Sequence, residues 1–100
     1  WPYFNLGILF IKEGKPEEAI GYLRQALDRN PSWPTGKVKL AMALTSIGKF
    51  EDALLQLNAV LRADAKNAEA HYQLGQLLTK MDKPEQAKEH LLLFEKLRSK

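Results

Sequence analysis

The sequence contains no cysteine, which excludes a disulfide framework, a thiolate zinc site and a cysteine nucleophile. It also lacks any run of the roughly 18 apolar residues that a membrane span needs, because Gly7, Lys12 and Gly14 interrupt the longest apolar stretches. We therefore expect a chain that is stabilised by packing alone and has no membrane-spanning helix. A reducing compartment such as the cytoplasm suits this chain, although no targeting segment is visible to establish its location.

The net charge of the chain is also small. The 15 basic and 12 acidic residues give a net charge of +3, and the two signs are interspersed along the chain. Nucleic-acid-binding domains concentrate their basic residues on one face, so we expect no nucleic acid partner. With 100 residues, 45% apolar and 27% charged, the composition is that of a single globular domain.

The sequence has none of the common catalytic or metal-binding motifs. His71 and His90 are the only histidines, and no carboxylate motif accompanies both of them. Ser32, Ser46 and Ser99 have no matching base, and there is no glycine-rich phosphate loop. These absences predict a non-enzymatic segment that holds neither a metal nor a cofactor.

What the sequence does contain is an internal repeat with an offset of 34 residues and no gaps. Five columns are identical in all three copies: Leu6, Leu40 and Leu74; Lys15, Lys49 and Lys83; Glu17, Glu51 and Glu85; Ala19, Ala53 and Ala87; Leu23, Leu57 and Leu91. Other columns vary conservatively: Gly7, Ala41 and Gly75; Phe10, Leu44 and Leu78; Gly14, Gly48 and Asp82. We divide the chain into repeats at about 1–33, 34–67 and 68–100.

Apolar residues recur at three- and four-residue steps within each repeat, which indicates helices and not strands. Gly14, Gly48 and Asp82 suit the left-handed residue that ends a helix, and Pro16 and Pro84 suit the start of the next one. Six helices are predicted, near residues 2–13, 16–29, 35–47, 50–63, 69–81 and 84–98. Small residues should let the two helices of a repeat approach closely, with the leucine columns filling the space between them. The predicted fold is all-α, and because one repeat cannot bury its apolar face alone, the three must stack.

With its small residue on the first helix, its alanine on the second and its closing Pro31, the 34-residue unit resembles the tetratricopeptide repeat (TPR). The resemblance covers essentially the whole chain. It implies a right-handed superhelical solenoid of three helix-turn-helix repeats that binds protein partners. In this family a concave groove, lined by the first helix of each repeat, holds a peptide.

By that resemblance, the peptide-binding groove consists of residues on the first helices: Phe4, Asn5, Ile8 and Lys12 from repeat one; Val38, Lys39 and Met42 from repeat two; Tyr72, Gln73, Gln76 and Lys80 from repeat three. The same resemblance places Trp1, Ser46 and Glu69 in the groove as well. The lysines outnumber the one acid, so a peptide that carries acidic or amide groups and one apolar anchor would suit this groove.

Each candidate also has a simpler interpretation. Lys39 and Lys80 are either groove cations or ordinary surface lysines, and Met42 lies either in the groove or in the core. Tyr72 and Gln76, one turn apart, either grip a peptide or do nothing. Phe4, together with Trp1, forms either an apolar anchor pocket or a core surface that a preceding helix would cover. Asn5 and Gln73 are the strongest single candidates, because the family often places a peptide-binding asparagine in their column.

One subclass of the family clamps the carboxylate terminus of heat-shock chaperones with lysine, asparagine and arginine. The corresponding positions here hold Phe4 and Ile8, Lys39, and Glu69 with Gln73. The clamp is therefore absent, and we do not expect a chaperone C-terminal tail as the partner.

The two ends of the array differ in polarity. Ile20 with Leu27, and Leu54 with Leu61, should pack on the next repeat, whereas the third copy has Lys88 and Glu95. This polar replacement predicts that the array ends near Lys100. We expect further repeats or a partner domain before Trp1, so that residues 1–100 are one TPR domain of a longer protein. Leu92 and Leu93 remain apolar and would support at most a weak homo-oligomer.

The sequence thus predicts a non-catalytic protein-protein interaction scaffold that binds a peptide segment of a partner. The alternatives are a regulatory or substrate-recruiting segment of a larger enzyme or assembly, and a self-associating module. The sequence identifies neither the partner nor the pathway.

Overall fold

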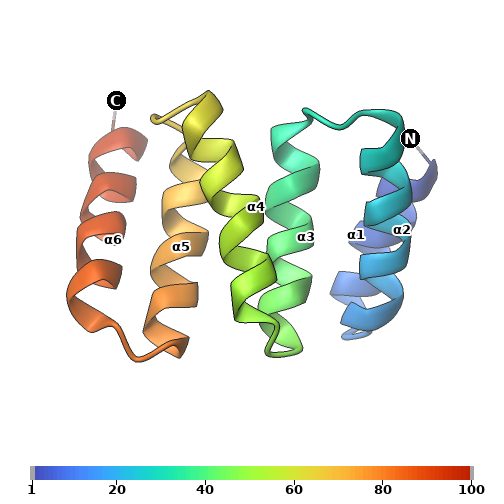
Figure 1. Cartoon of the computed structure of the whole chain (residues 1–100), viewed down its shortest axis with the longest axis horizontal. Coiled ribbons are helices and arrows are strands. Elements are labelled where there is room, and N and C mark those ends of the chain that lie inside the picture. Colours follow the sequence, from blue (N-terminus) through green and yellow to red (C-terminus); the bar gives the residue numbers. More distant parts are fainter. Residues whose placement is uncertain (1, 100) are drawn as a thin grey trace.

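The computed structural model describes residues 2–99, and the described chain is folded into six helices. Trp1 and Lys100, which the sequence analysis placed at the groove and at the array end, lie outside the described residues. The helices are α1 (Pro2–Lys12), α2 (Pro16–Arg29), α3 (Pro34–Ser46), α4 (Phe50–Ala63), α5 (Ala68–Lys80) and α6 (Pro84–Arg98). They succeed one another along the 35 Å long axis, with α1 and α2 at one end and α5 and α6 at the other (Figure 1). The predicted all-α repeat solenoid is confirmed.

The helix boundaries follow the local chemistry of each turn. Gly14, Gly48 and Asp82 have positive φ angles of 73°, 81° and 60°, as the sequence predicts for residues that end a helix. Each turn contains the same backbone hydrogen bond, exemplified by the Lys15 N–H donating to the Phe10 carbonyl at 2.8 Å. The observed limits of α2, α4 and α6 equal the predicted ones, whereas α1, α3 and α5 end one residue earlier, and α3 and α5 also begin one residue earlier.

Two of those differences have clear causes. Helix α3 begins at Pro34, whose missing N–H is no loss in the first turn of a helix. Helix α5 begins at Ala68 because the Asn67 side chain caps it, accepting a hydrogen bond from the Ala70 N–H at 3.0 Å.

Small residues hold the two helices of a repeat close together. A Cβ added to Gly7 would lie 2.7 Å from Leu23 Cδ2, and one added to Gly75 would collide with Leu91. Ala19 and Ala53 are fully buried, and Ala87 is 3% exposed. The predicted close approach of α1 to α2 and of α5 to α6 is therefore confirmed.

The leucine column on the first helices corrects one expectation. Leu40 and Leu74 are buried, but Leu6 is 36% exposed and does not fill the core. The reason is stacking: α2 packs on α3 and α4 packs on α5, whereas no described helix precedes α1. Ile20, Leu27, Leu54 and Leu61 pack partly buried against the core, while Lys88 and Glu95 are exposed on α6. Within residues 2–99, no helix is long and apolar enough to cross a membrane.

Candidate peptide-binding groove

A pocket of about 400 Å³ lies along the first helices of the three repeats and is lined by residues of α1, α3 and α5. Ile11 from α1, together with Met42 and Ala43 from α3, makes it partly apolar. The remaining lining residues are Gly14, Pro16, Thr45, Ser46, Gln73, Gln76 and Lys80. The pocket joins the first helices of all three repeats, which is the face that the sequence analysis identified as the groove.

The hydroxyl groups of the pocket already have their hydrogen-bond donors engaged. Thr45 Oγ1 donates to the Ala41 carbonyl at 2.8 Å, and Ser46 Oγ donates to the Met42 carbonyl at 3.1 Å. Each hydroxyl oxygen therefore faces the pocket mainly as an acceptor. This wall suits the N–H groups of a ligand.

The α5 side of the pocket supplies free donors. Neither Gln73 nor Gln76 makes a side-chain hydrogen bond to another residue of the described chain, and Lys80 has no carboxylate within ion-pair distance there. Gln73 is half-buried, whereas Gln76 and Lys80 are exposed. Two amides and one ammonium group are therefore free to bind a ligand's carbonyl or carboxylate oxygens.

Five of the predicted groove residues line this pocket: Met42, Ser46, Gln73, Gln76 and Lys80. Asn5 and Lys12 are exposed on α1 and Ile8 is half-buried there, but the pocket does not reach them. Phe4 packs on Trp33, with ring centroids 4.3 Å apart, and is partly buried against the core.

Val38 was predicted to lie in the groove, and the structure places it in the core instead. It is 1% exposed and belongs to the main cluster of buried apolar residues. In a stacked array the middle first helix is covered from both neighbouring repeats, so its apolar side chain is drawn inward. Val38 therefore has no surface to offer a ligand.

Lys39 is not a free cation. Its Nζ lies 3.5 Å from Glu69 Oε1, and this ion pair joins α3 to α5. Glu69 thus compensates the charge that the sequence analysis assigned to the groove floor, and Lys80 carries the unpaired positive charge next to the pocket.

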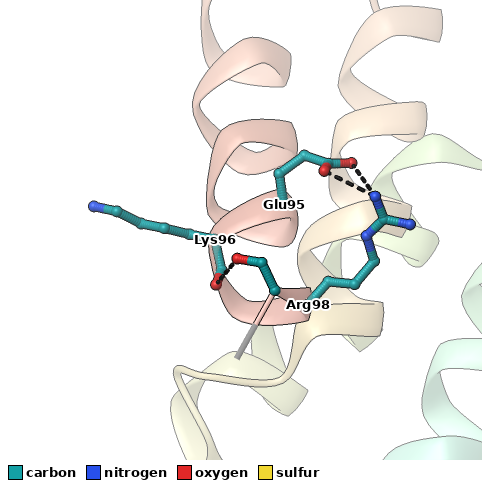
Figure 2. Close-up of polar contacts among 4 residues, drawn as sticks. Glu95, Lys96 and Arg98 are labelled. Atoms are coloured by element: carbon teal, nitrogen blue, oxygen red, sulfur yellow. Dashed lines mark hydrogen bonds and ion pairs between the residues drawn. The ribbon is translucent and has the colours of Figure 1, made fainter.

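Tyr72 packs against the neighbouring helix of its own repeat. Its ring lies 4.9 Å from that of Phe94 on α6, and it remains 38% exposed. Arg98 lies over the same Phe94 ring. It also donates two hydrogen bonds to the Glu95 carboxylate on the exposed surface of α6 (Figure 2). Tyr72 is therefore partly committed to the packing of α5 on α6.

The sequence analysis missed Ile11 and Thr45 as pocket residues. They occupy one repeat column with Thr79, the residue before Lys80. A step of three residues from the predicted Ile8 and Met42 would have identified both, because residues three apart lie on the same face of a helix.

The two histidines, which the sequence left unrelated, make a direct contact. His71 lies on α5 and His90 on α6, and their Nδ1 atoms are 2.9 Å apart. No group of three or more histidine, aspartate or glutamate side chains within residues 2–99 is arranged to hold a metal ion.

Family models match most of the chain. A model described as "Tetratricopeptide repeat" matches residues 1–32, a second with the same description matches 68–100, and one described as "TPR repeat" matches 41–82. Among curated proteins, tetratricopeptide repeat protein 21B of Homo sapiens is 34% identical over 96 residues, covering 93% of this chain and 7% of that protein. The TPR repeat-containing thioredoxin TTL4 of Arabidopsis thaliana is 28% identical over 85 residues, covering 85% of this chain and 12% of that protein.

Solved structures of similar shape carry peptide sites. YrrB, described as a TPR protein with an unusual peptide-binding site, superposes with a TM-score of 0.88 at 27% identity, over 97% of this chain and 50% of that one. The second TPR of Spaghetti (RPAP3), bound to the HSP90 peptide SRMEEVD, superposes with a TM-score of 0.86 at 25% identity, over 96% of this chain and 89% of that one.

Proposed function

The chain belongs to the tetratricopeptide repeat family of protein-interaction modules, and from that premise we propose that residues 1–100 form one domain that binds a peptide segment of a partner protein in its concave groove. The domain acts as a non-catalytic scaffold, because its role is to hold the partner and not to change it. The observation that carries this proposal is the pocket where the first helices of all three repeats meet, with its unengaged amides and ammonium group.

Peptide binding by structures of the same shape supports the proposal. YrrB is described as having a peptide-binding site, and the second TPR of Spaghetti is bound to a peptide. Because this chain spans only 7% and 12% of the two curated relatives, their overall activities do not transfer to it.

The pocket's chemistry defines the ligand that we propose. No acidic side chain lines it, Lys80 is unpaired, and Gln73 and Gln76 offer both donors and acceptors. Ile11 and Met42 provide an apolar surface that a single aliphatic or aromatic side chain can cover. The preferred peptide is extended, carries an acidic or amide side chain near Lys80, and places one apolar residue against Met42.

The chaperone C-terminal tail is not the ligand we propose, although a similar structure is bound to the HSP90 peptide SRMEEVD. The family's clamp uses lysine, asparagine and arginine at positions that here hold Phe4 and Ile8, Lys39, and Glu69 with Gln73. Phe4 is committed to Trp33, so this end of the groove is apolar and lacks a partner for a terminal carboxylate. The peptide SRMEEVD should therefore bind no more tightly than a scrambled version.

A second role is favoured by the Arabidopsis relative, which is named a TPR repeat-containing thioredoxin. In that role the same groove recruits a substrate or regulator to a catalytic domain of a larger protein. The two roles share one binding surface and differ in what is attached to it, so the binding experiment tests both at once.

The test is peptide selection followed by calorimetry. A random peptide library is selected on the purified chain, and the affinity of the best peptide is measured for the unmodified chain and for Gln73→Ala and Lys80→Glu. We expect a dissociation constant of roughly micromolar order. Loss of one hydrogen bond of about 0.5–1.5 kcal/mol should weaken peptide binding by Gln73→Ala roughly twofold to twelvefold. Lys80→Glu should weaken the binding of an acidic peptide about tenfold, and this effect should be smaller at high salt.

Two control variants make the same types of substitution at positions outside the groove. Gln25→Ala on α2 and Lys88→Glu on α6 change exposed residues outside the pocket and should leave the dissociation constant unchanged. If the two pocket variants bind as tightly as the unmodified chain, the concave face is not the binding site.

A further inference from the structure

The contact between the two histidines links three parts of the third repeat. His71 on α5 is 6% exposed, and its Nε2 lies 2.8 Å from the carbonyl oxygen of Ala65 in the connection between α4 and α5. Its Nδ1 lies 2.9 Å from Nδ1 of His90 on α6. The two rings are stacked with centroids 5.2 Å apart. One buried imidazole therefore joins α5 to the preceding connection and to α6.

Hydrogen-bond chemistry fixes which nitrogen carries each proton. A carbonyl oxygen only accepts, so His71 Nε2–H must be the donor to Ala65. In the neutral ring the other nitrogen, His71 Nδ1, has no proton and must accept. His90 Nδ1–H is then the donor to His71, and only this arrangement of two neutral rings makes both contacts.

The same geometry limits how many protons the pair holds. A first extra proton goes to Nε2 of the half-buried His90 and leaves its Nδ1–H donating to His71 as before. A second extra proton has only His71 Nδ1 available. It would set two N–H groups against each other at a separation of 2.9 Å and place two positive charges side by side.

The neighbouring charges do little to reduce the repulsion between two protonated rings. Burial, and then the adjacent His71, lower the pKa of His90 below its usual 6.5, and only Glu89 acts in the opposite direction. Within residues 2–99 neither imidazole has an ion pair with a carboxylate. The charged residues close in sequence to the two rings or to Ala65 are Asp64, Lys66, Glu69, Lys88 and Glu89. Glu69 is paired with Lys39 of α3, and Arg62 lies near the end of α4.

We propose that the His71–His90 contact is a pH-sensitive latch between α5 and α6, which is closed while at most one of the two rings is protonated and opens when both are. Opening breaks the hydrogen bond between the two rings and loosens the packing of α6 on α5, while the Nε2–H of His71 can still donate to Ala65. The latch does not depend on the proposed peptide site. Its effect reaches that site through α5, which carries Gln73, Gln76 and Lys80.

The direction of the pH effect follows from proton linkage. The unfolded chain takes up a proton on each histidine near pH 6.5, whereas the folded chain resists uptake because the pKa of His90 is lowered. The contribution of the latch to stability is therefore complete above about pH 6.5 and decreases as the pH falls below that value. With no cysteine, the two histidines are the only side chains whose usual pKa lies between 5 and 8, so this window belongs to them.

Three chains distinguish the pH dependence caused by the two histidines from that of other titrating groups. They are the unmodified chain, His90→Asn, and the double variant His71→Gln with His90→Asn. Asparagine at 90 keeps a donor near the Nδ1 position and glutamine at 71 keeps a donor near the Nε2 position, but neither titrates. Urea unfolding is followed for each chain at pH 7.5 and 5.5. The unfolding constant of the unmodified chain should rise about tenfold to a hundredfold at the lower pH, that of His90→Asn by less, and that of the double variant by less than about threefold.

A second measurement does not require any variant to fold. Nitrogen-15 spectra of the imidazole side chains should show protonated Nε2 for His71 and protonated Nδ1 for His90 at pH 7.5. At pH 5.5, hydrogen exchange should quicken in α6 more than in α2, which contains no histidine.

The proposal is overturned if the spectra show the opposite tautomers, or if the unmodified chain is equally stable at both pH values. It is also overturned if the double variant retains the pH dependence of the unmodified chain.

Discussion

At the scale of single residues, position in the turn decides what a glycine contributes. Gly14 has φ +73°, a conformation that an L side chain rarely adopts, although its surroundings are open. Gly21 lies within helix α2, and no atom lies within 4 Å of a Cβ added there. The same substitution should therefore have opposite effects at the two positions.

Gly14→Ala should destabilise the chain by about 1–2 kcal/mol because alanine is strained at positive φ. Gly21→Ala should stabilise it by about 0.5–1 kcal/mol because alanine favours the helix and restricts the unfolded chain. Urea unfolding of both variants checks this pair of effects. Equal signs would show that the turn at Gly14 does not need its left-handed conformation.

At the scale of helices, small residues set the spacing of each pair. Ala53 is fully buried between α3 and α4, and Leu57 one turn later is also fully buried. The repeat column predicted this role from sequence, because alanine recurs at Ala19 and Ala87. A larger side chain at Ala53 has no space to occupy without moving one helix.

Ala53→Leu should destabilise the chain by about 1–3 kcal/mol through overpacking. Ala63→Leu at the exposed end of α4 adds the same atoms where nothing confines them, and should change stability by less than about 0.5 kcal/mol. Thermal unfolding followed by circular dichroism compares the two variants. A destabilisation of equal size in both would remove the close helix approach as its cause.

How far the sequence predicted the helices and the groove depends on the range of the interactions. Helix number and turn residues follow from local chemistry that repeats every 34 residues, so Gly14, Gly48 and Asp82 were identified correctly. The exposure of Leu6 and the burial of Val38 depend on which helix lies alongside, and periodicity within one helix does not contain that information. The Lys39–Glu69 pair and the His71–His90 contact cross between helices and were missed for the same reason.

At the scale of the whole molecule, each repeat depends on its neighbour. Leu40, Ala43 and Leu44 of the middle repeat are at most 3% exposed, and α3 is packed against helices of both adjacent repeats as well as against α4. The equivalent Leu6 and Leu9 on α1, with no described helix before them, are 36% and 46% exposed. The buried core is therefore continuous through the array and does not belong to one repeat.

A synthetic peptide of residues 34–67 alone should consequently remain unfolded. It loses the covering helices on both sides, and one repeat buries too little apolar surface to offset its conformational entropy. Far-ultraviolet circular dichroism at room temperature is the measurement. A cooperative melting transition of the isolated repeat would contradict this view of the array.

The central claim is that a partner peptide binds across the first helices, and the most direct test maps the contact on the molecule. The amide and methyl resonances of the chain are recorded during titration with the selected peptide. The account predicts that the largest shifts fall on Ile11, Met42, Thr45, Gln73, Gln76 and Lys80, with little change on the outer face of α2. Shifts confined to Leu92 and Leu93 on α6, or to α2, would contradict it by placing the peptide on another surface.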